Sequence, residues 1–234
     1  MANIGFSTGA LARGDFRRGL DILRRNQIYS VELCALRSSE LEPLIQSIDT
    51  LGLEEFSYVS FHAPSKFDAE EEWRIVEHLG AIAERGWNII VHPDSITQHE
   101  LWKQFGNLLL IENMDKRKPI GRNKPELESI FDSLPEASFC FDIGHASQVD
   151  PTMSVAYTLL KTFGDRLKEV HISYVNTQSG HERITYDSIL SFKEVADLIP
   201  TNIQVIIESS IGESEISSEI RSVHMALQSQ DVYA

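Results

Sequence analysis

Apolar residues form two kinds of pattern along this chain: short continuous runs, and longer stretches in which they recur three and four residues apart. A short apolar run is typical of a buried strand, and the wider spacing is typical of a helix with one buried face. Helical spacing is found, for example, over Phe16 to Arg25, Leu41 to Leu51, Glu71 to Arg85, Val155 to Phe163 and Phe192 to Ile199. We predict strands near residues 3–7, 29–36, 56–62, 88–92, 107–112, 137–142, 167–171 and 203–208.

The alternation of strand and helix, repeated eight times, predicts an α/β fold, namely a single (β/α)8 TIM barrel over residues 1–234. Most of the strands are rich in Val, Ile, Leu and Phe with little alternation, as expected when both faces are covered. No linker rich in Pro, Gly or Ser marks a domain boundary. An open doubly wound sheet is the alternative, but the first strand is followed only by Ser7-Thr8-Gly9, a weak glycine signal.

Six of the strand-like runs end in a carboxylate or an imidazole. Such a side chain packs poorly at the end of a buried strand, because an unpaired charge loses its hydration there. In a TIM barrel the C-terminal ends of the strands converge on one mouth, where the active site lies. The sequence therefore predicts one shared site made of His62, His92, Glu112, Asp142, His171 and Glu208.

Three carboxylates and three imidazoles at one mouth would repel one another or lose hydration without a cation between them. We therefore expect a divalent metal ion. Three carboxylates with one imidazole suit Mn²⁺, Mg²⁺ or Co²⁺, whereas adding His62 and His92 shifts the preference toward Zn²⁺ or Fe²⁺. Glu32, on the second predicted strand, is another possible ligand, but a role in orienting a ligand or anchoring a loop is favoured.

Composition narrows the classes of partner. The 234 residues, 42% of them apolar, suffice for one continuous core. The balance of 21 basic and 35 acidic residues gives a net charge of −14, which works against binding to nucleic acid or anionic lipid. Cys34 and Cys140 lie in apolar runs, which favours two buried thiols. No apolar run approaches the ~20 residues that span a bilayer, so we expect a cytoplasmic protein. We also expect a small-molecule substrate. Assembly into homo-oligomers is left open.

Short motifs surround the strand-end residues: Phe-His-Ala-Pro at His62, Val-His-Pro at His92, Ile-Glu-Asn at Glu112, Phe-Asp-Ile-Gly-His from Asp142 to His145, Val-His-Ile-Ser at His171 and Ile-Ile-Glu at Glu208. This ordered set covers nearly the whole chain and resembles the xylose isomerase-like TIM barrels. That superfamily includes sugar isomerases, ketose epimerases, inosose-processing enzymes and endonuclease IV. The set is specific to the superfamily and not to one reaction.

The resemblance implies a role for each of these residues. Glu112, Asp142, His171 and Glu208 would be the principal ligands of one divalent ion, and Glu112 and Glu208 would also move protons as catalytic residues. Positions that match His62, His92, His145 and His181 help to hold additional zinc ions in endonuclease IV. That nuclease has an aspartate two residues before its last histidine, where this chain has Ser179. The third metal position therefore lacks one carboxylate.

A basic segment, Lys116 to Lys124, follows the fifth predicted strand. In a barrel this loop lies on the catalytic face, so Lys118 and Arg122 are candidates to bind a phosphate or carboxylate of the substrate. A solvated loop partly neutralised by Asp115 is the equal alternative. Arg183, two residues beyond His181, is a third candidate for contact with an anionic substrate.

The favoured function is that of a metal-dependent isomerase or epimerase, acting on a sugar, a sugar phosphate or a related ketone by proton transfer next to a metal-polarised carbonyl. The first alternative is phosphodiester hydrolysis of the endonuclease IV type. A multinuclear iron oxidase and a non-catalytic metal-binding barrel are further alternatives. One bound ion would favour the epimerase, and two or three would favour the nuclease or the oxidase.

Overall fold

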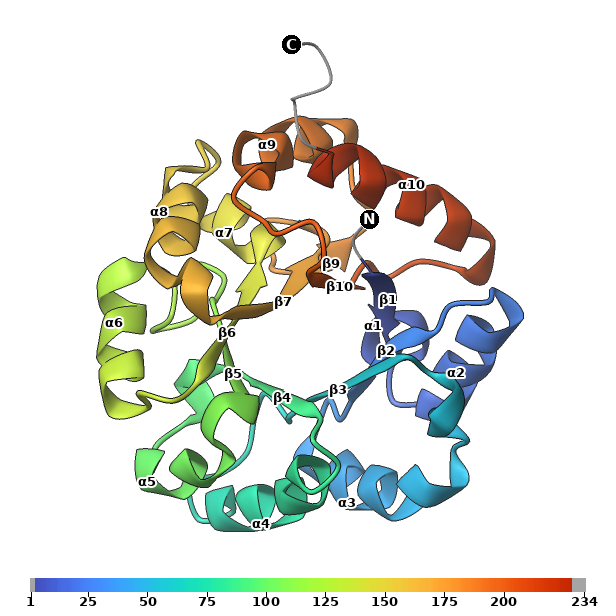
Figure 1. Cartoon of the computed structure of the whole chain (residues 1–234), viewed down its shortest axis with the longest axis vertical. Helices are drawn as coiled ribbons and strands as arrows, with labels where there is room; N and C mark the ends of the chain where they lie inside the picture. The colour runs from blue at the N-terminus through green and yellow to red at the C-terminus, as the bar shows by residue number, and fades with distance from the viewer. Residues whose placement is uncertain (1–2, 229–234) are drawn as a thin grey trace.

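Eight parallel strands form a closed barrel in a computed structural model of the chain, which describes residues 3–228. Neighbouring strands follow the order β1-β10-β7-β6-β5-β4-β3-β2, and Figure 1 looks along the barrel. The predicted (β/α)8 TIM barrel is therefore confirmed. The barrel strands are β1 (Asn3–Ser7), β2 (Ser30–Cys34), β3 (Tyr58–His62), β4 (Asn88–Val91), β5 (Leu109–Glu112), β6 (Ser138–Asp142), β7 (Leu167–Ile172) and β10 (Gln204–Ile207).

Helices surround the barrel and bury their apolar faces against it (Figure 1). They are α1 (Thr8–Ala12), α2 (Phe16–Arg25), α3 (Ser38–Ser47), α4 (Glu72–Ala83), α5 (His99–Trp102), α6 (Lys124–Ser133), α7 (Ile143–Val149), α8 (Ser154–Phe163), α9 (Tyr186–Ala196) and α10 (Ile216–Leu227). Short 3₁₀ helices are η1 (Ile48–Thr50), η2 (Leu53–Glu55), η3 (Pro93–Ser95), η4 (Lys103–Leu108), η5 (Gly164–Arg166) and η6 (Glu213–Glu215). Among these helices, none is long and apolar enough to cross a membrane.

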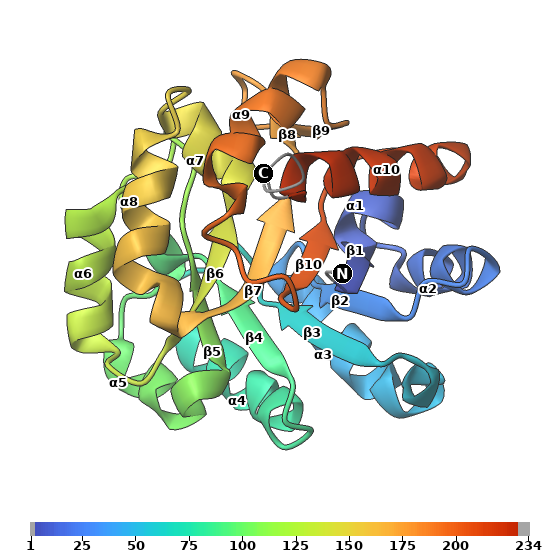
Figure 2. The same ribbon diagram turned by 45° about the horizontal axis from the view of Figure 1, so that its top comes forward.

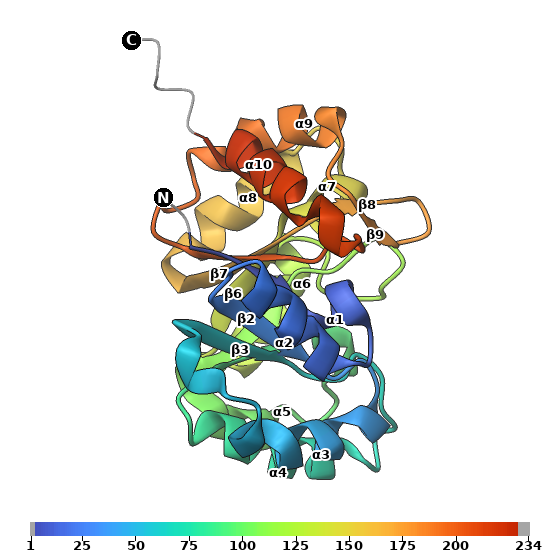
Figure 3. The ribbon, with the colours of Figure 1, turned by 90° about the vertical axis from the view of Figure 1, so that its right-hand side faces the viewer.

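An additional antiparallel pair, β8 (Tyr174–Val175) and β9 (His181–Glu182), follows β7. It pairs Val175 with His181. The views in Figures 2 and 3 place this pair at the same end of the molecule as α1, which follows the carboxyl end of β1. The pair therefore returns His181 to the mouth of the barrel.

The main differences from the predicted elements are at helix boundaries. The helix predicted over Phe192 to Ile199 covers only the second half of α9, which begins at Tyr186. It begins there because the Thr185 side chain accepts a hydrogen bond from the backbone N–H of Ser188 and so caps the helix. Cys34 and Cys140 are buried free thiols, as predicted.

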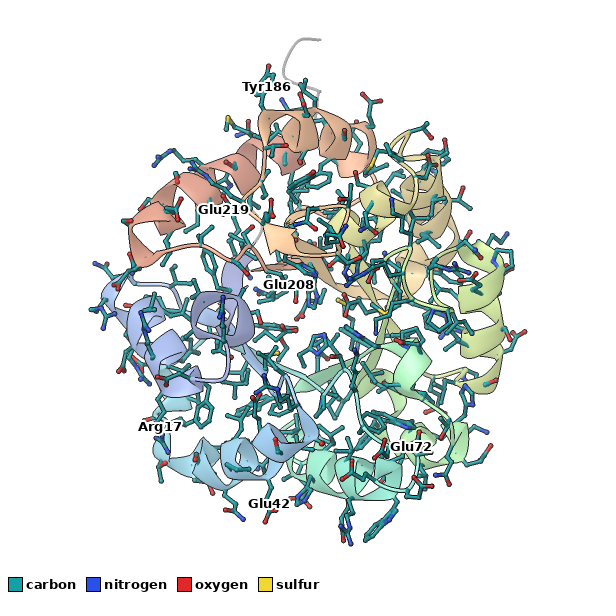
Figure 4. All side chains as sticks on the ribbon, turned by 180° about the vertical axis from the view of Figure 1, so that it is seen from behind. Arg17, Glu42, Glu72, Tyr186, Glu208 and Glu219 are labelled. Carbon is teal, nitrogen blue, oxygen red and sulfur yellow. The ribbon has the colours of Figure 1, made fainter. Side chains whose placement is uncertain are left out.

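A buried carboxylate, Glu72 of α4, anchors the segment that follows β4. It accepts hydrogen bonds from the backbone N–H of Thr97 at 2.9 Å and from Nε1 of Trp102 at 2.8 Å. Figure 4 labels Glu72 on its helix. Burial raises the pKa of Glu72, but these hydrogen bonds outweigh burial and hold its pKa below the usual value.

We expect Glu72→Leu to lower the free energy of unfolding by about 3 kcal/mol, because it leaves several buried donors without an acceptor. Urea denaturation at pH 7 measures this loss, and Glu77→Leu on the exposed face of the same helix is the matched control. Since the pKa of Glu72 is depressed in the folded state, its contribution is present at neutral pH and is lost as the pH falls below about 4.3. Equal stability of the two variants would contradict this role.

Candidate metal centre

The strand-end residues meet at the mouth of the barrel. His62, Glu112, Asp142 and His171 lie on strands, whereas His92 and Glu208 come one residue after β4 and β10. Four of them, His62, His92, Glu112 and Glu208, line a cavity of about 230 Å³ together with His145 and His181. Asp142 and His171 are fully buried. Figure 4 shows Glu208 near the centre of the barrel.

The eight predicted metal ligands fall into three overlapping clusters, each with ligand atoms within 4.8 Å of one another. The central cluster is Glu112, Asp142, His171 and Glu208. A flanking cluster joins Glu112 to His62 and His92, and the other joins Asp142 to His145 and His181. Glu112 and Asp142 are therefore shared between neighbouring clusters.

The two carboxylate oxygens of Glu112 face opposite sides of the site. Nε2 of His62 and Nε2 of His92 each lie 3.2 Å from Oε2. Nδ1 of His145 lies 3.2 Å from Oε1, and Nδ1 of His171 lies 3.7 Å from it. Glu112 is only 1% exposed, so these imidazoles replace the water that would otherwise solvate its charge.

Hydrogen bonds to the backbone indicate which nitrogen of His62 and of His145 could bind a cation. The Nδ1 atoms of His62 and His145 lie 2.8 and 2.9 Å from the carbonyl oxygens of Ala63 and Asn113. A carbonyl only accepts, so Nδ1 donates in both rings, and Nε2 is the nitrogen that each ring could present to a cation. Nε2 of His145 lies 3.3 Å from Nε2 of His181, as expected for two ligands directed at one ion. In the described residues, Nδ1 of His171 is buried without a hydrogen-bond partner.

Asp142 owes its position to the junction of β6 and α7. It caps α7, since its Oδ1 accepts from the N–H of His145 at 2.6 Å, while its buried Oδ2 has no hydrogen-bond partner among the described residues. Asn113 holds the junction by two hydrogen bonds with the backbone of Asp142. Gly144 allows α7 to approach β7, because a Cβ there would lie 2.4 Å from the carbonyl oxygen of Ser173.

The mutual electrostatics of the site are strong. Burial lowers the pKa of His62 and His145, but neighbouring carboxylates, Glu112 and Asp142 above all, outweigh it and raise these pKa values to about 9 and about 10. Burial raises the pKa of Asp142 to about 8. Burial also favours the neutral form of Glu112, yet the surrounding imidazoles hold its pKa well below its usual value. A divalent cation bound there would displace the protons that balance these carboxylates.

Ser179 lies between β8 and β9, two residues before His181 of the flanking cluster of Asp142, His145 and His181. Its hydroxyl donates to the carboxylate of Asp115, and its own φ is +55°. This cluster therefore contains one carboxylate, from Asp142, and two imidazoles. The departure at Ser179 leaves a three-residue donor set in place.

The three predicted anion-binding residues lie outside the cavity lining. Nζ of Lys118 lies 2.9 Å from Asp94 and 3.3 Å from Nδ1 of His92, at the edge of the site. Arg122 pairs with Glu126 at 2.7 Å, and Arg183 lies 3.6 Å from Glu215. Their role in substrate binding stays a prediction, and acidic partners already compete for each cation.

Several supporting residues could not be predicted from the sequence. Glu219 of α10 is fully buried, and its Oε1 accepts from the N–H of Ile184 at 2.9 Å and from the hydroxyl of Ser209. It thereby joins the loop after His181 to the residue after Glu208, and Figure 4 labels both glutamates. Asn113 was visible only as part of a motif. A buried polar residue on a helix carries no periodic signal, so Glu219 had no signature in the sequence.

Similar folds occur in three solved structures. An endonuclease IV from Thermus thermophilus is 17% identical, with a TM-score of 0.64 over 96% of this chain and 98% of that chain. A 3-keto-D-glucoside 4-epimerase from E. coli is 14% identical, with a TM-score of 0.63 over 97% and 99% of the two chains. A xylose isomerase domain protein from Alicyclobacillus acidocaldarius is 11% identical, with a TM-score of 0.66 over 97% and 98%.

These likenesses confirm the resemblance to the xylose isomerase-like TIM barrels at the level of the fold. Neither a protein-family model nor a curated protein sequence matches the chain. Because the three structures include both a nuclease and an epimerase, the fold leaves the reaction to be argued from the residues at the mouth.

Proposed function

We propose that this protein is a metal-dependent hydrolase that cleaves a phosphate ester of a small molecule at a centre of two or three divalent ions. The arrangement of Glu112 carries the proposal. Its Oε2 faces His62 and His92, and its Oε1 faces the central cluster. A carboxylate with its two oxygens directed at different donor sets is suited to bridge two cations.

The donor sets fit these ions chemically. The central cluster offers three carboxylates and one imidazole, and the flanking clusters are richer in histidine. Mixed nitrogen and oxygen donors suit Zn²⁺, Fe²⁺ or Mn²⁺. The buried atoms Oδ2 of Asp142 and Nδ1 of His171, both without hydrogen-bond partners in the described residues, support the same conclusion.

Divalent ions bound there would supply Lewis-acid chemistry, stabilising charge on a phosphoryl oxygen and making water a stronger nucleophile. Glu112 would hold neighbouring cations in fixed positions through its two oxygens. Glu208 is 15% exposed, and its Oε2 lies 3.3 Å from Nδ1 of His181 at the cavity. It is the carboxylate best placed to accept a proton from attacking water while still in the centre.

The cavity favours a compact substrate. Its volume is about 230 Å³, and besides the metal-ligand candidates its lining includes small residues such as Gly9, Ala10 and Ala35. Its lining contains no Lys or Arg among residues 3–228, so the bound cations would be the main attraction for a phosphate group. The net charge of −14 also argues against a nucleic acid substrate.

Proton transfer on a sugar or related ketone, the function favoured by the sequence, is the second candidate. Glu112 and Glu208 both belong to the central cluster, and both line the cavity. With one ion in the central cluster, these two carboxylates would remove and return a proton on carbon. This candidate ranks second because the imidazoles of His62, His92 and His145 already surround the oxygens of Glu112.

Metal analysis and two assays test the proposal. We expect two or three ions per chain by elemental analysis, and release of phosphate or alcohol from a panel of small phosphate monoesters and diesters. The parallel assay measures solvent deuterium entering ketoses and ketose phosphates. One ion per chain, deuterium incorporation and no ester hydrolysis would replace the hydrolase with the epimerase. Absence of bound ions after incubation with Zn²⁺, Mn²⁺ or Fe²⁺ would overturn both.

A further inference from the structure

Beneath the mouth, the interior of the barrel holds a buried polar cluster around His171. Its Nε2 lies 3.0 Å from Oε1 of Glu169 and 3.1 Å from Oε2 of Glu32. All three side chains are fully buried. Carboxylate oxygens only accept when ionised, so Nε2 is the nitrogen that carries the proton.

Glu169 is itself held from the far side of the barrel. The hydroxyl of Tyr58 donates to its Oε2, and the hydroxyl of Ser60 lies 3.4 Å from its Oε1. The side-chain amide of Asn88 donates to the Tyr58 oxygen at 2.9 Å. Because Asn88 occupies the acceptor side of Tyr58, the tyrosine proton is directed toward Glu169.

These hydrogen bonds have one direction, from Asn88 to Tyr58 to Glu169, whose other oxygen then accepts from His171. With the proton on Nε2, the lone pair of His171 is on Nδ1. That atom lies 3.7 Å from Oε1 of Glu112 and 3.6 Å from Oε1 of Glu208, inside the central cluster. The interior therefore determines which nitrogen His171 presents at the mouth.

We propose that Tyr58 and Glu169 are positioning residues that fix the tautomer and ring orientation of His171, and so set the affinity of the central cluster for its ion. The inference rests on metal binding in the proposed function and not on the reaction catalysed. Tyr58 is a better residue to test than Glu32, because neither side-chain oxygen of Glu32 makes a hydrogen bond among the described residues. Residues that orient a metal-bound imidazole typically change metal affinity 10–100-fold when they are replaced.

Tyr58→Phe is the sharpest test, because it removes one hydroxyl and retains the ring. Metal-free protein would be titrated with Co²⁺, following visible absorption and competition with a chelator of known affinity. We expect the Kd of the central ion to rise about 10–100-fold and its absorption band to change. Tyr29→Phe is the matched control, since Tyr29 is 48% exposed and lies outside the buried cluster around His171.

A second variant separates positioning from general stability. Glu169→Gln keeps the shape of the side chain but brings an amide donor next to Nε2, which favours the opposite tautomer. We expect Co²⁺ affinity to fall at least as far as in Tyr58→Phe. The thermal midpoint of the metal-free protein is measured in parallel to detect structural damage.

Unchanged Co²⁺ affinity and spectrum in both variants, while the parent binds Co²⁺, would overturn this inference and leave the proposed function standing. A lower thermal midpoint in the metal-free variants with the parental Kd would have the same meaning. A folded parent protein that binds no Co²⁺ would overturn the proposed function and this inference together.

Discussion

Chelation is expected to lower the thermal midpoint of this protein by about 10 °C. An ion present at a thousand times its Kd stabilises the folded state by about 4 kcal/mol, and each kcal/mol corresponds to roughly 2–4 °C in a chain of this size. The donors Glu112, Asp142, His171 and Glu208 come from four different strands or strand ends, so their site forms only in the folded state. Differential scanning calorimetry before and after dialysis against a chelator, and after return of Zn²⁺ or Mn²⁺, measures the effect.

Asp142→Asn is the control for this experiment. The asparagine keeps the oxygen that caps α7 through the N–H of His145, but it removes the negative charge from two clusters. We therefore expect the variant to fold and to respond much less to chelator. Equal shifts in parent and variant would mean that the stabilising ion binds elsewhere, and no shift in the parent would contradict the metal centre.

The sequence predicted the barrel well because strands and strand ends leave local signals. Apolar runs located the eight barrel strands, and the polar residues that close six of these runs supplied candidate members of the site. The pair of β8 and β9 was not predicted, since each strand has two residues and no apolar run. Motif similarity, rather than strand periodicity, identified His181.

The interior of the site was less predictable, for a physical reason. Glu169 lies in the least apolar of the strand-like runs, but nothing in that run shows that it meets Tyr58 from another strand. The same limit applies to Lys118, whose pairing with Asp94 depends on two loops meeting in space. A sequence shows which residues carry charge, whereas the tertiary contacts decide which of those charges are already neutralised.

Glu112→Gln is expected to reduce turnover by about 10³-fold or more and to lower the metal content by at least one ion per chain. Lewis-acid stabilisation contributes several kcal/mol, and each 1.36 kcal/mol is tenfold in rate. Glutamine keeps one neutral oxygen but cannot bridge two cations as a carboxylate does. Steady-state kinetics with elemental analysis of the same samples measures both effects.

Two further variants make this result specific. Glu128→Gln is the same chemical change at an exposed ion pair with Lys124, and we expect parental activity and metal content. His181→Ala removes a donor from one flanking cluster only, so it should cost at most one ion and leave the central cluster filled. Because Glu112 belongs to two clusters and His181 to one, the glutamate variant should lose at least as many ions as the histidine variant. Full metal content in Glu112→Gln, or a larger loss in His181→Ala, would show that Glu112 does not bridge the centre.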